Sequence, residues 1–162
     1  MNLVGIGYDV HRFVTGRPLV LGGVAIPHSH GLEGHSDADV LAHAIADAVL
    51  GAVGMRDIGH HFPNSDESIR GISSMEILRK IGALLRSKGH RVINVDASLI
   101  AEAPKIGAHV EAMRSNIAAA LQIESGRIGV KATTNEGLGF VGRAEGIAAI
   151  AVASVAAADN PD

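Results

Sequence analysis

Apolar positions recur with two different periods along the chain, and each period predicts a different element. Over residues 91–101 every second side chain is apolar, which is the period of a strand with one buried face. The apolar members of that face are Ile93, Val95, Ala97 and Leu99. Over residues 39–53 apolar side chains recur every three or four positions, which predicts a helix with one side towards the core. The members of that side are Leu41, Ile45, Ala48, Val49 and Ala52.

Local signals place the other elements between these two. Runs of β-forming residues predict strands, alanine-rich runs predict helices, and a Ser-x-x-Glu box at residues 73–76 predicts a helix start. In chain order we expect a strand over 2–13, a short strand at 19–21 inside a loop of residues 14–37, a loop over 56–74, a helix from the box to about 88–89, a helix over 108–122 and a strand over 128–134. Strands thus alternate with helices, which favours an α/β fold with helices on at least one face of a sheet.

The apolar tail, residues 147–157, fits a helix by its alanines and a buried strand by its Ile and Val. We interpret it as a strand that is apolar on both faces. One face can pack against helices. The other must be covered by another subunit, which indicates a homo-oligomer, or by the rest of the same chain. Both alternatives stay open here.

Composition narrows the class of protein. The 162 residues carry 14 Lys+Arg against 17 Asp+Glu, a net charge of −3, and only 2% aromatic residues. This balance excludes a basic, aromatic-lined nucleic-acid groove. The chain has no Cys, so a metal would have to bind imidazole and carboxylate groups, and nine His residues are available. The N-terminus lacks the features of a signal peptide, and the longest apolar stretch, 147–158, is shorter than the roughly 20 residues of a membrane helix. We therefore expect one domain over 1–162, in the cytoplasm and without a membrane partner.

One combination of residues has the chemistry of a metal site. Asp9 and His11 are two positions apart on a predicted strand, so their side chains point the same way. His43 lies on the predicted helix, with Asp39 and Asp47 four positions to either side. Such a stripe is typical of a solvated surface, but it also fits an imidazole ligand supported by carboxylates. Asp9, His11 and His43 together would supply three ligands, as in a zinc site with one open position. Both interpretations stay open.

Two further segments offer groups that suit phosphates. Residues 101–107 turn at a proline from a strand towards a helix and could hold a base and a phosphate, but their residue types alone favour a plain strand–helix turn. Residues 131–146 combine a lysine, two threonines, a carboxylate and glycines, which suit phosphate groups and a hard cation. Within them, 137–142 reads G-x-G-x-x-G. Only 20 residues follow, too few for the second strand of a dinucleotide-binding unit, so we reject that fingerprint.

Six motifs in order along nearly the whole chain give a specific resemblance. They are Gly-Tyr-Asp-Val-His-Arg (7–12), His-Ser-Asp-Ala-Asp-Val-Leu-Ala-His-Ala (35–44), Asp-Ile-Gly-His-His-Phe-Pro (57–63), Ala-Pro-Lys (103–105), Lys-Ala-Thr-Thr (131–134) and Gly-Phe-Val-Gly-Arg (139–143). In these motifs the chain resembles the 2-C-methyl-D-erythritol 2,4-cyclodiphosphate synthases of the non-mevalonate isoprenoid pathway. The resemblance implies a two-layer α+β fold: a mixed sheet with helices on one face, the sheets of three subunits packing around the axis of a homotrimer.

The same resemblance implies a set of site residues. It implies one zinc ion per subunit on Asp9, His11 and His43, a magnesium or manganese ion on Glu136, and transition-state stabilisation by His35 and Thr134. The substrate-binding residues that it implies are Asp9, Val10, His11, His35, Ser36, Asp57, Ile58, Gly59, Phe62, Pro63, Asn64, Ser65, Asp66, Ala101, Glu102, Ala103, Pro104, Lys105, Ile106, Gly107, Thr133, Thr134, Asn135, Glu136, Phe140 and Arg143.

The resemblance also implies the reaction. A synthase of this kind closes 4-diphosphocytidyl-2-C-methyl-D-erythritol 2-phosphate into the cyclic diphosphate and releases CMP, so it is a lyase with a small-molecule substrate. Two alternatives stay open at this stage. One is a zinc-dependent hydrolase of nucleotide diphosphates, with water as nucleophile. The other is a non-catalytic trimeric module that binds a nucleotide or an isoprenoid.

Overall fold

A five-stranded mixed sheet forms the centre of the molecule. The structure is a computed structural model, and it describes residues 1–158; residues 159–162 of the expected domain lie outside them. The sheet order is β4-β1-β7-β5-β6, and only β5 and β6 run parallel. Its strands are β1 (Asn2–Val14), β4 (Gly31–Leu32), β5 (His90–Ile100), β6 (Ile128–Thr133) and β7 (Gly146–Ala157). A separate two-stranded hairpin joins β2 (Leu19–Leu21) to β3 (Val24–Ile26).

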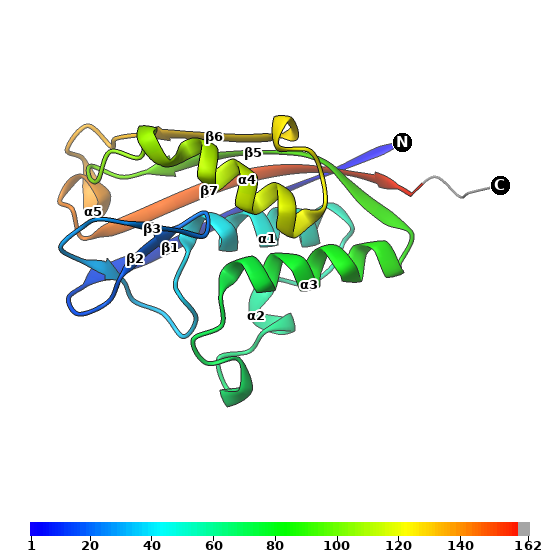
Figure 1. Cartoon of the computed structure of the whole chain (residues 1–162), viewed down its shortest axis with the longest axis horizontal. Helices are drawn as coiled ribbons and strands as arrows, with labels where there is room; N and C mark the ends of the chain where they lie inside the picture. The colour runs from blue at the N-terminus through cyan, green and yellow to red at the C-terminus, as the bar shows by residue number, and fades with distance from the viewer. Residues whose placement is uncertain (159–162) are drawn as a thin grey trace.

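Three long helices, α1 (Val40–Ala52), α3 (Ser74–Ser87) and α4 (Val110–Leu121), lie on one side of the sheet (Figure 1). Helix α1 packs on β1 and β7, and α3 packs on both α1 and α4. Short elements complete the chain. They are α2 (Ile58–His61), α5 (Gly139–Gly142) and three 3₁₀ turns at Glu67–Ile69, Gly107–His109 and Ser125–Arg127. No helix within residues 1–158 is long and apolar enough to cross a membrane.

Two glycines of β1 let α1 approach the strand at backbone distance. A Cβ atom on Gly7 would lie 2.0 Å from the carbonyl oxygen of Ala44, and one on Gly5 would lie 2.1 Å from that of Ala48. Real Cβ atoms do not come so close to other atoms, so only glycine allows this contact. The close approach brings the side chains of α1 directly over those of β1. This packing determines where the candidate site forms.

The predicted strands and long helices are present, but the structure differs from the prediction in several places. The expected loop of residues 14–37 contains β3 and β4 besides the predicted short strand, and α5 was not predicted. The predicted loop over 56–74 contains α2 and the 3₁₀ turn Glu67–Ile69. In β5 the register shifts between Val92 and Asn94, so Val92 is buried and Ile93 only partly so. A β-bulge adds one residue to one strand, and the period-2 pattern changes face at that point. Finally, the Ser-x-x-Glu box is only half formed: Ser73 accepts from the Met75 N–H, whereas Glu76 pairs with Arg79.

The tail forms strand β7, as predicted, and only one of its two faces is covered by the described part of the chain. Its helix-facing side is buried, whereas Ile150 and Val152 on the other side are 38% and 43% exposed. Across the ladder, Tyr8 pairs with Ile150 and Ile6 with Val152. Together with Val4 and Val10 they form an apolar surface on the sheet face away from the helices, which we call the open face. Within residues 1–158 the chain does not cover this face itself.

Candidate metal centre

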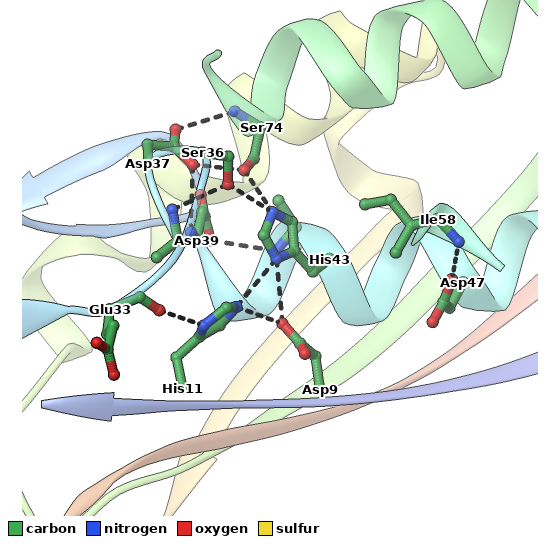
Figure 2. A network of polar contacts seen from close by, with 12 residues as sticks. Asp9, His11, Glu33, Ser36, Asp37, Asp39, His43, Asp47, Ile58 and Ser74 are labelled. Carbon is green, nitrogen blue, oxygen red and sulfur yellow. Dashed lines mark hydrogen bonds and ion pairs between the residues drawn. The ribbon is translucent and has the colours of Figure 1, made fainter. Parts of the chain in front are cut away.

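The joint between β1 and α1 brings three potential ligands together (Figure 2). Asp9 and His11 extend from β1, and His43 extends from the first turns of α1. His11 Nε2 lies 2.9 Å from Asp9 Oδ2, and His43 Nδ1 lies 3.1 Å from each of these two atoms. No other group of three or more His, Cys, Asp or Glu side chains in residues 1–158 converges in this way. The three residues predicted from the sequence therefore meet at one point.

Hydrogen bonds on the far side of each imidazole orient the rings. His11 Nδ1 lies 2.6 Å from the carbonyl oxygen of Glu33. A carbonyl oxygen only accepts, so His11 carries its proton on Nδ1 and directs Nε2 at the other two ligands. His43 Nε2 lies 2.9 Å from Ser74 Oγ and 3.2 Å from Ser36 Oγ. Metal-binding histidines are commonly held in this manner by their second nitrogen.

The electrostatics of the cluster favour a cation at its centre. Burial raises the pKa of Asp9, but the neighbouring His11 and His43 imidazoles, by contact and by charge, outweigh that effect and lower the pKa from 3.8 to about 2. Burial lowers the pKa of His11, but the contact with Asp9, the negative charge of Asp9 and the hydrogen bond to the Glu33 carbonyl together outweigh it and raise the pKa above 6.5. Three electron-pair donors thus converge where a positive charge is favoured. One carboxylate and two imidazoles are also ligands that zinc accepts.

Asp39 and Asp47, the two carboxylates expected to bracket His43, form hydrogen bonds to backbone N–H groups elsewhere. Asp39 is fully buried and caps α1, accepting N–H bonds from Gly22 at 3.0 Å and Gly23 at 2.7 Å. Burial raises its pKa to about 6. Asp47 accepts the N–H of Ile58 at 2.7 Å and so fixes the start of α2. Both carboxylates thus bond to backbone N–H groups and not to the His43 ring, so the interpretation of them as supports for His43 is wrong. The interpretation as a solvated stripe is also wrong, because α1 is buried on nearly all sides.

Sequence reasoning missed the groups that do support the imidazoles. These are the Glu33 carbonyl, Ser74 and, behind Ser74, Asp37. Asp37 and Ser74 stand 37 positions apart, so no local pattern links them. One feature of the sequence could have indicated Ser74, since it is a polar residue at a predicted helix start. The Ser-x-x-Glu box explains it only as part of the helix start.

A cavity of about 210 Å³ opens beside the three ligands. Of the predicted substrate contacts it is lined by Asp9, His11, His35, Ser36, Ile58, Gly59, Phe62 and Asn64. Other predicted contacts lie outside this lining. Asp57 caps α2 and Asp66 caps the following 3₁₀ turn, and these hydrogen bonds lower the pKa of both carboxyls. Pro63 and Ser65 are exposed in the same loop, and Val10 belongs to the open face.

A second cavity, of about 400 Å³, lies at the ends of β5 and β6. Of the predicted contacts it is lined by Ala101, Pro104, Lys105, Ile106, Gly107, Thr133 and Thr134. Glu102 and Ala103 line a neighbouring cavity of about 520 Å³. This second cavity shares no lining residue with the cavity at the metal centre. Within one chain, the two groups of predicted contacts are therefore separate.

Residues 133–137 form a turn beside the second cavity. The Glu102 carboxylate accepts the N–H of Asn135 at 2.9 Å and that of Gly137 at 3.3 Å. The Thr134 hydroxyl lies 3.2 Å from Glu136 Oε1. Phe140, on α5, is 39% exposed, and Arg143 pairs with Glu145 at 2.7 Å. Glu136 belongs to no group of three or more potential metal ligands among the described residues.

Fold and site together define a mixed α/β protein in which an Asp, a His and a second His, placed to bind a metal ion, meet at a strand–helix joint. Residues 2–156 match the YgbB family. The chain is 57% identical over 152 residues to the 2-C-methyl-D-erythritol 2,4-cyclodiphosphate synthase of Alkaliphilus oremlandii, covering 94% of this chain and 97% of the relative. It is 58% identical to that of Symbiobacterium thermophilum, covering 95% and 98%. The chain belongs to the YgbB family.

Solved structures agree. The bifunctional IspDF from Campylobacter jejuni superposes with a TM-score of 0.92 at 44% identity, covering 96% of this chain and 42% of that one. A CDP complex of IspF from Plasmodium falciparum superposes with a TM-score of 0.85 at 34% identity, covering 98% and 97%.

Proposed function

We propose that this chain is a 2-C-methyl-D-erythritol 2,4-cyclodiphosphate synthase, acting as one domain in the cytoplasm. The observation that carries the proposal is the Asp9–His11–His43 cluster in a chain that is 57% identical, over nearly its full length, to a relative bearing that name. The substrate is 4-diphosphocytidyl-2-C-methyl-D-erythritol 2-phosphate.

The reaction is an intramolecular phosphoryl transfer. An oxygen of the 2-phosphate forms a bond to the β-phosphorus, and the bond from that phosphorus to the oxygen of the CMP phosphate breaks. The products are the cyclic diphosphate and CMP. The 2-phosphate is already an anion at neutral pH, so the protein need not supply a general base. Its task is to align two phosphates and neutralise their charge.

The metal centre suits this task. We assign zinc to Asp9, His11 and His43, and a second divalent cation, Mg²⁺ or Mn²⁺, to Glu136. When bound, these ions would polarise the phosphate under attack and offset the charge on the leaving group. The chain itself orients the ligands through the Glu33 carbonyl and Ser74, and it places His35 on the wall of the same cavity. His35 and Thr134 are the residues that we propose contact the reacting phosphates.

The second cavity is the proposed cytidine site. Its walls combine the backbone of residues 104–107 with the hydroxyl-bearing Thr133 and Thr134. A related structure, the Plasmodium falciparum protein, is a complex with CDP, and it covers 98% of this chain. Loop residues 62–66 would contact the methylerythritol phosphate, and Arg143 would lie near the substrate.

The open face supports a homotrimer as part of the proposal. Val4, Ile6 and Tyr8 are 66%, 66% and 53% exposed, and they continue onto β7. Contiguous apolar surface of this kind typically marks a protein interface. Packing three copies through this face would also let one subunit's cytidine cavity face the metal centre of its neighbour. That arrangement would reconcile a single substrate with two separate cavities.

Turnover followed by ³¹P NMR tests the proposal. We expect equal amounts of CMP and cyclic diphosphate, lost with a chelator and restored by zinc plus magnesium. The variant His43→Ala should lose bound zinc and turnover. His90→Ala, at the start of β5 and outside the lining of both cavities, should keep them. CMP with linear phosphates would instead indicate the hydrolase. No CMP from folded, metal-loaded protein would indicate a binding module.

A further inference from the structure

His43 is supported from behind by two residues that belong to different parts of the chain. Ser74 is the first residue of α3 and is fully buried, and its Oγ lies 2.9 Å from His43 Nε2. Asp37 precedes α1 and hydrogen-bonds to the Ser74 hydroxyl. The three side chains form a continuous line, carboxylate to hydroxyl to imidazole, that ends at the metal centre (Figure 2).

The direction of each hydrogen bond in this line follows from the backbone. Asp37 Oδ2 accepts the N–H of Ser74 at 2.9 Å, and Oδ1 accepts the N–H of Asp39 at 3.2 Å. Because an N–H can only donate, both oxygens of Asp37 act as acceptors. The Ser74 hydroxyl therefore donates its single proton to Asp37. Towards His43 it can then only accept, so the imidazole proton must lie on Nε2.

The consequence appears on the other side of the ring. An imidazole with its proton on Nε2 has a free electron pair on Nδ1, the atom that faces Asp9 and His11. Ser36 also lies near Nε2, at 3.2 Å. Its oxygen accepts the N–H of Ala38, and its own proton is uncommitted, so it follows the tautomer instead of setting it. His11 needs the opposite tautomer, which the Glu33 carbonyl provides.

We propose that Asp37 and Ser74 are positioning residues that fix the Nε2–H tautomer of His43 and thereby keep Nδ1 available to the metal. The proposal rests on the proposed function, because it takes Asp9, His11 and His43 as the metal ligands. Partners of this kind typically contribute about 10- to 100-fold to metal affinity. They also make the N-terminus of α3 part of the metal centre, although α3 supplies no ligand.

NMR of the metal-free protein tests the tautomer directly. Long-range ¹H–¹⁵N spectra of the imidazoles at about pH 8 distinguish a protonated nitrogen from a free one. We expect His43 to show the Nε2–H form in the wild type and a mixture of forms in Ser74→Ala. His11 should show the Nδ1–H form in both. A wild-type His43 that carries its proton on Nδ1 would overturn the proposal without any variant having to fold.

Zinc affinity, measured by competition with a chromogenic chelator, gives the second readout. We expect Ser74→Ala and Asp37→Asn each to bind zinc about 10- to 100-fold more weakly. Ser73→Ala is the matched control, since it removes the neighbouring helix cap but no contact to His43. It should bind zinc like the wild type. Equal weakening in Ser73→Ala and Ser74→Ala would show that only helix stability matters, and would overturn the proposal.

His43→Ala separates this proposal from the one on which it rests. If His43→Ala still binds zinc as the wild type does, the ligand set itself is wrong. If His43→Ala loses zinc but Ser74→Ala keeps full zinc affinity, the assignment of the ligands is supported. The role of Asp37 and Ser74 is then refuted. Retained zinc affinity in His43→Ala would thus count against both proposals, whereas retained affinity in Ser74→Ala alone counts against one.

Discussion

The metal centre and the cytidine side of the molecule are constructed differently. At the metal centre, side chains from β1 and α1 meet because two backbones touch, and Ser74 and Asp39 around them are completely buried. At the cytidine side, residues 101–107 and 133–137 are turns at strand ends, and their polar groups are largely exposed and bonded to close neighbours. The first region depends on the whole fold being correct, and the second depends on local turn geometry.

Adding one methyl group at Gly7 should break the first region. Gly7→Ala would place Cβ 2.0 Å from a backbone oxygen of α1 and 2.7 Å from the Ala48 nitrogen, so the helix must move. We expect a loss of about 3 kcal/mol or more in the free energy of unfolding, with weaker zinc binding. Denaturant titration measures it. Gly126→Ala, where a Cβ would meet nothing within 4 Å, is the control and should change stability by less than about 1 kcal/mol.

Separating the subunits should part the metal centre of one subunit from the cytidine cavity of its neighbour, while each region keeps its own structure. Ile6→Lys places a charge on the open face, so we expect a smaller oligomer by light scattering, with zinc affinity unchanged. Turnover should fall about 100-fold or more, because one chain would lack the neighbour's cytidine cavity. Ala25→Lys, an exposed position on β3, should leave both properties intact. Full turnover by a monomeric Ile6→Lys protein would refute a site shared between subunits.

A mutation on the cytidine side should weaken substrate binding and leave the free energy of unfolding nearly unchanged. Glu102→Ala removes the acceptor for two N–H groups of the 133–137 turn. We expect KM for the substrate to rise about tenfold while the unfolding free energy changes by less than about 1 kcal/mol. Glu102→Gln keeps an acceptor oxygen and should restore most of the affinity. Steady-state kinetics decide the matter, and a large loss of stability in Glu102→Ala would remove the contrast between the two regions.

The smallest expected effect concerns Asp47, at the border of the metal centre. Burial raises the pKa of Asp47 above 3.8, so the folded protein holds this proton more tightly than the unfolded chain. The stabilisation is complete below the unfolded pKa and is lost as pH rises through the folded pKa. Relative to the wild type, Asp47→Asn should therefore gain stability between about pH 4 and 7, by less than about 1 kcal/mol because the group is half exposed to solvent. Urea titrations at both pH values measure the difference, and an opposite sign would contradict it.

The sequence predicted most of this molecule where the cause is local. Periodicity and residue preferences located the long helices and all strands except β3 and β4. The i, i+2 spacing of Asp9 and His11 correctly placed both on one face of β1. Prediction from the sequence failed where segments that are distant along the chain meet. Asp39 and Asp47 look like partners of His43 by spacing, yet each bonds to backbone groups of other loops. Asp37 and Ser74 were missed for the same reason, since packing of α3 on α1 brings them together.

Strand β1 divides two tasks between its odd and even positions. Gly5, Gly7, Asp9 and His11 face α1, whereas Val4, Ile6, Tyr8 and Val10 form the open face. A one-residue shift in the register of the whole strand against α1 and β7 would exchange the two faces, since side chains alternate along a strand. Ile6 and Tyr8 would then point at α1, where the packing leaves room only for glycine. The Asp9 carboxylate and the His11 imidazole would move to the open face. A single register shift would therefore abolish ion binding and self-association together. A second mutation confined to the α1-facing side or to the open face could not restore both.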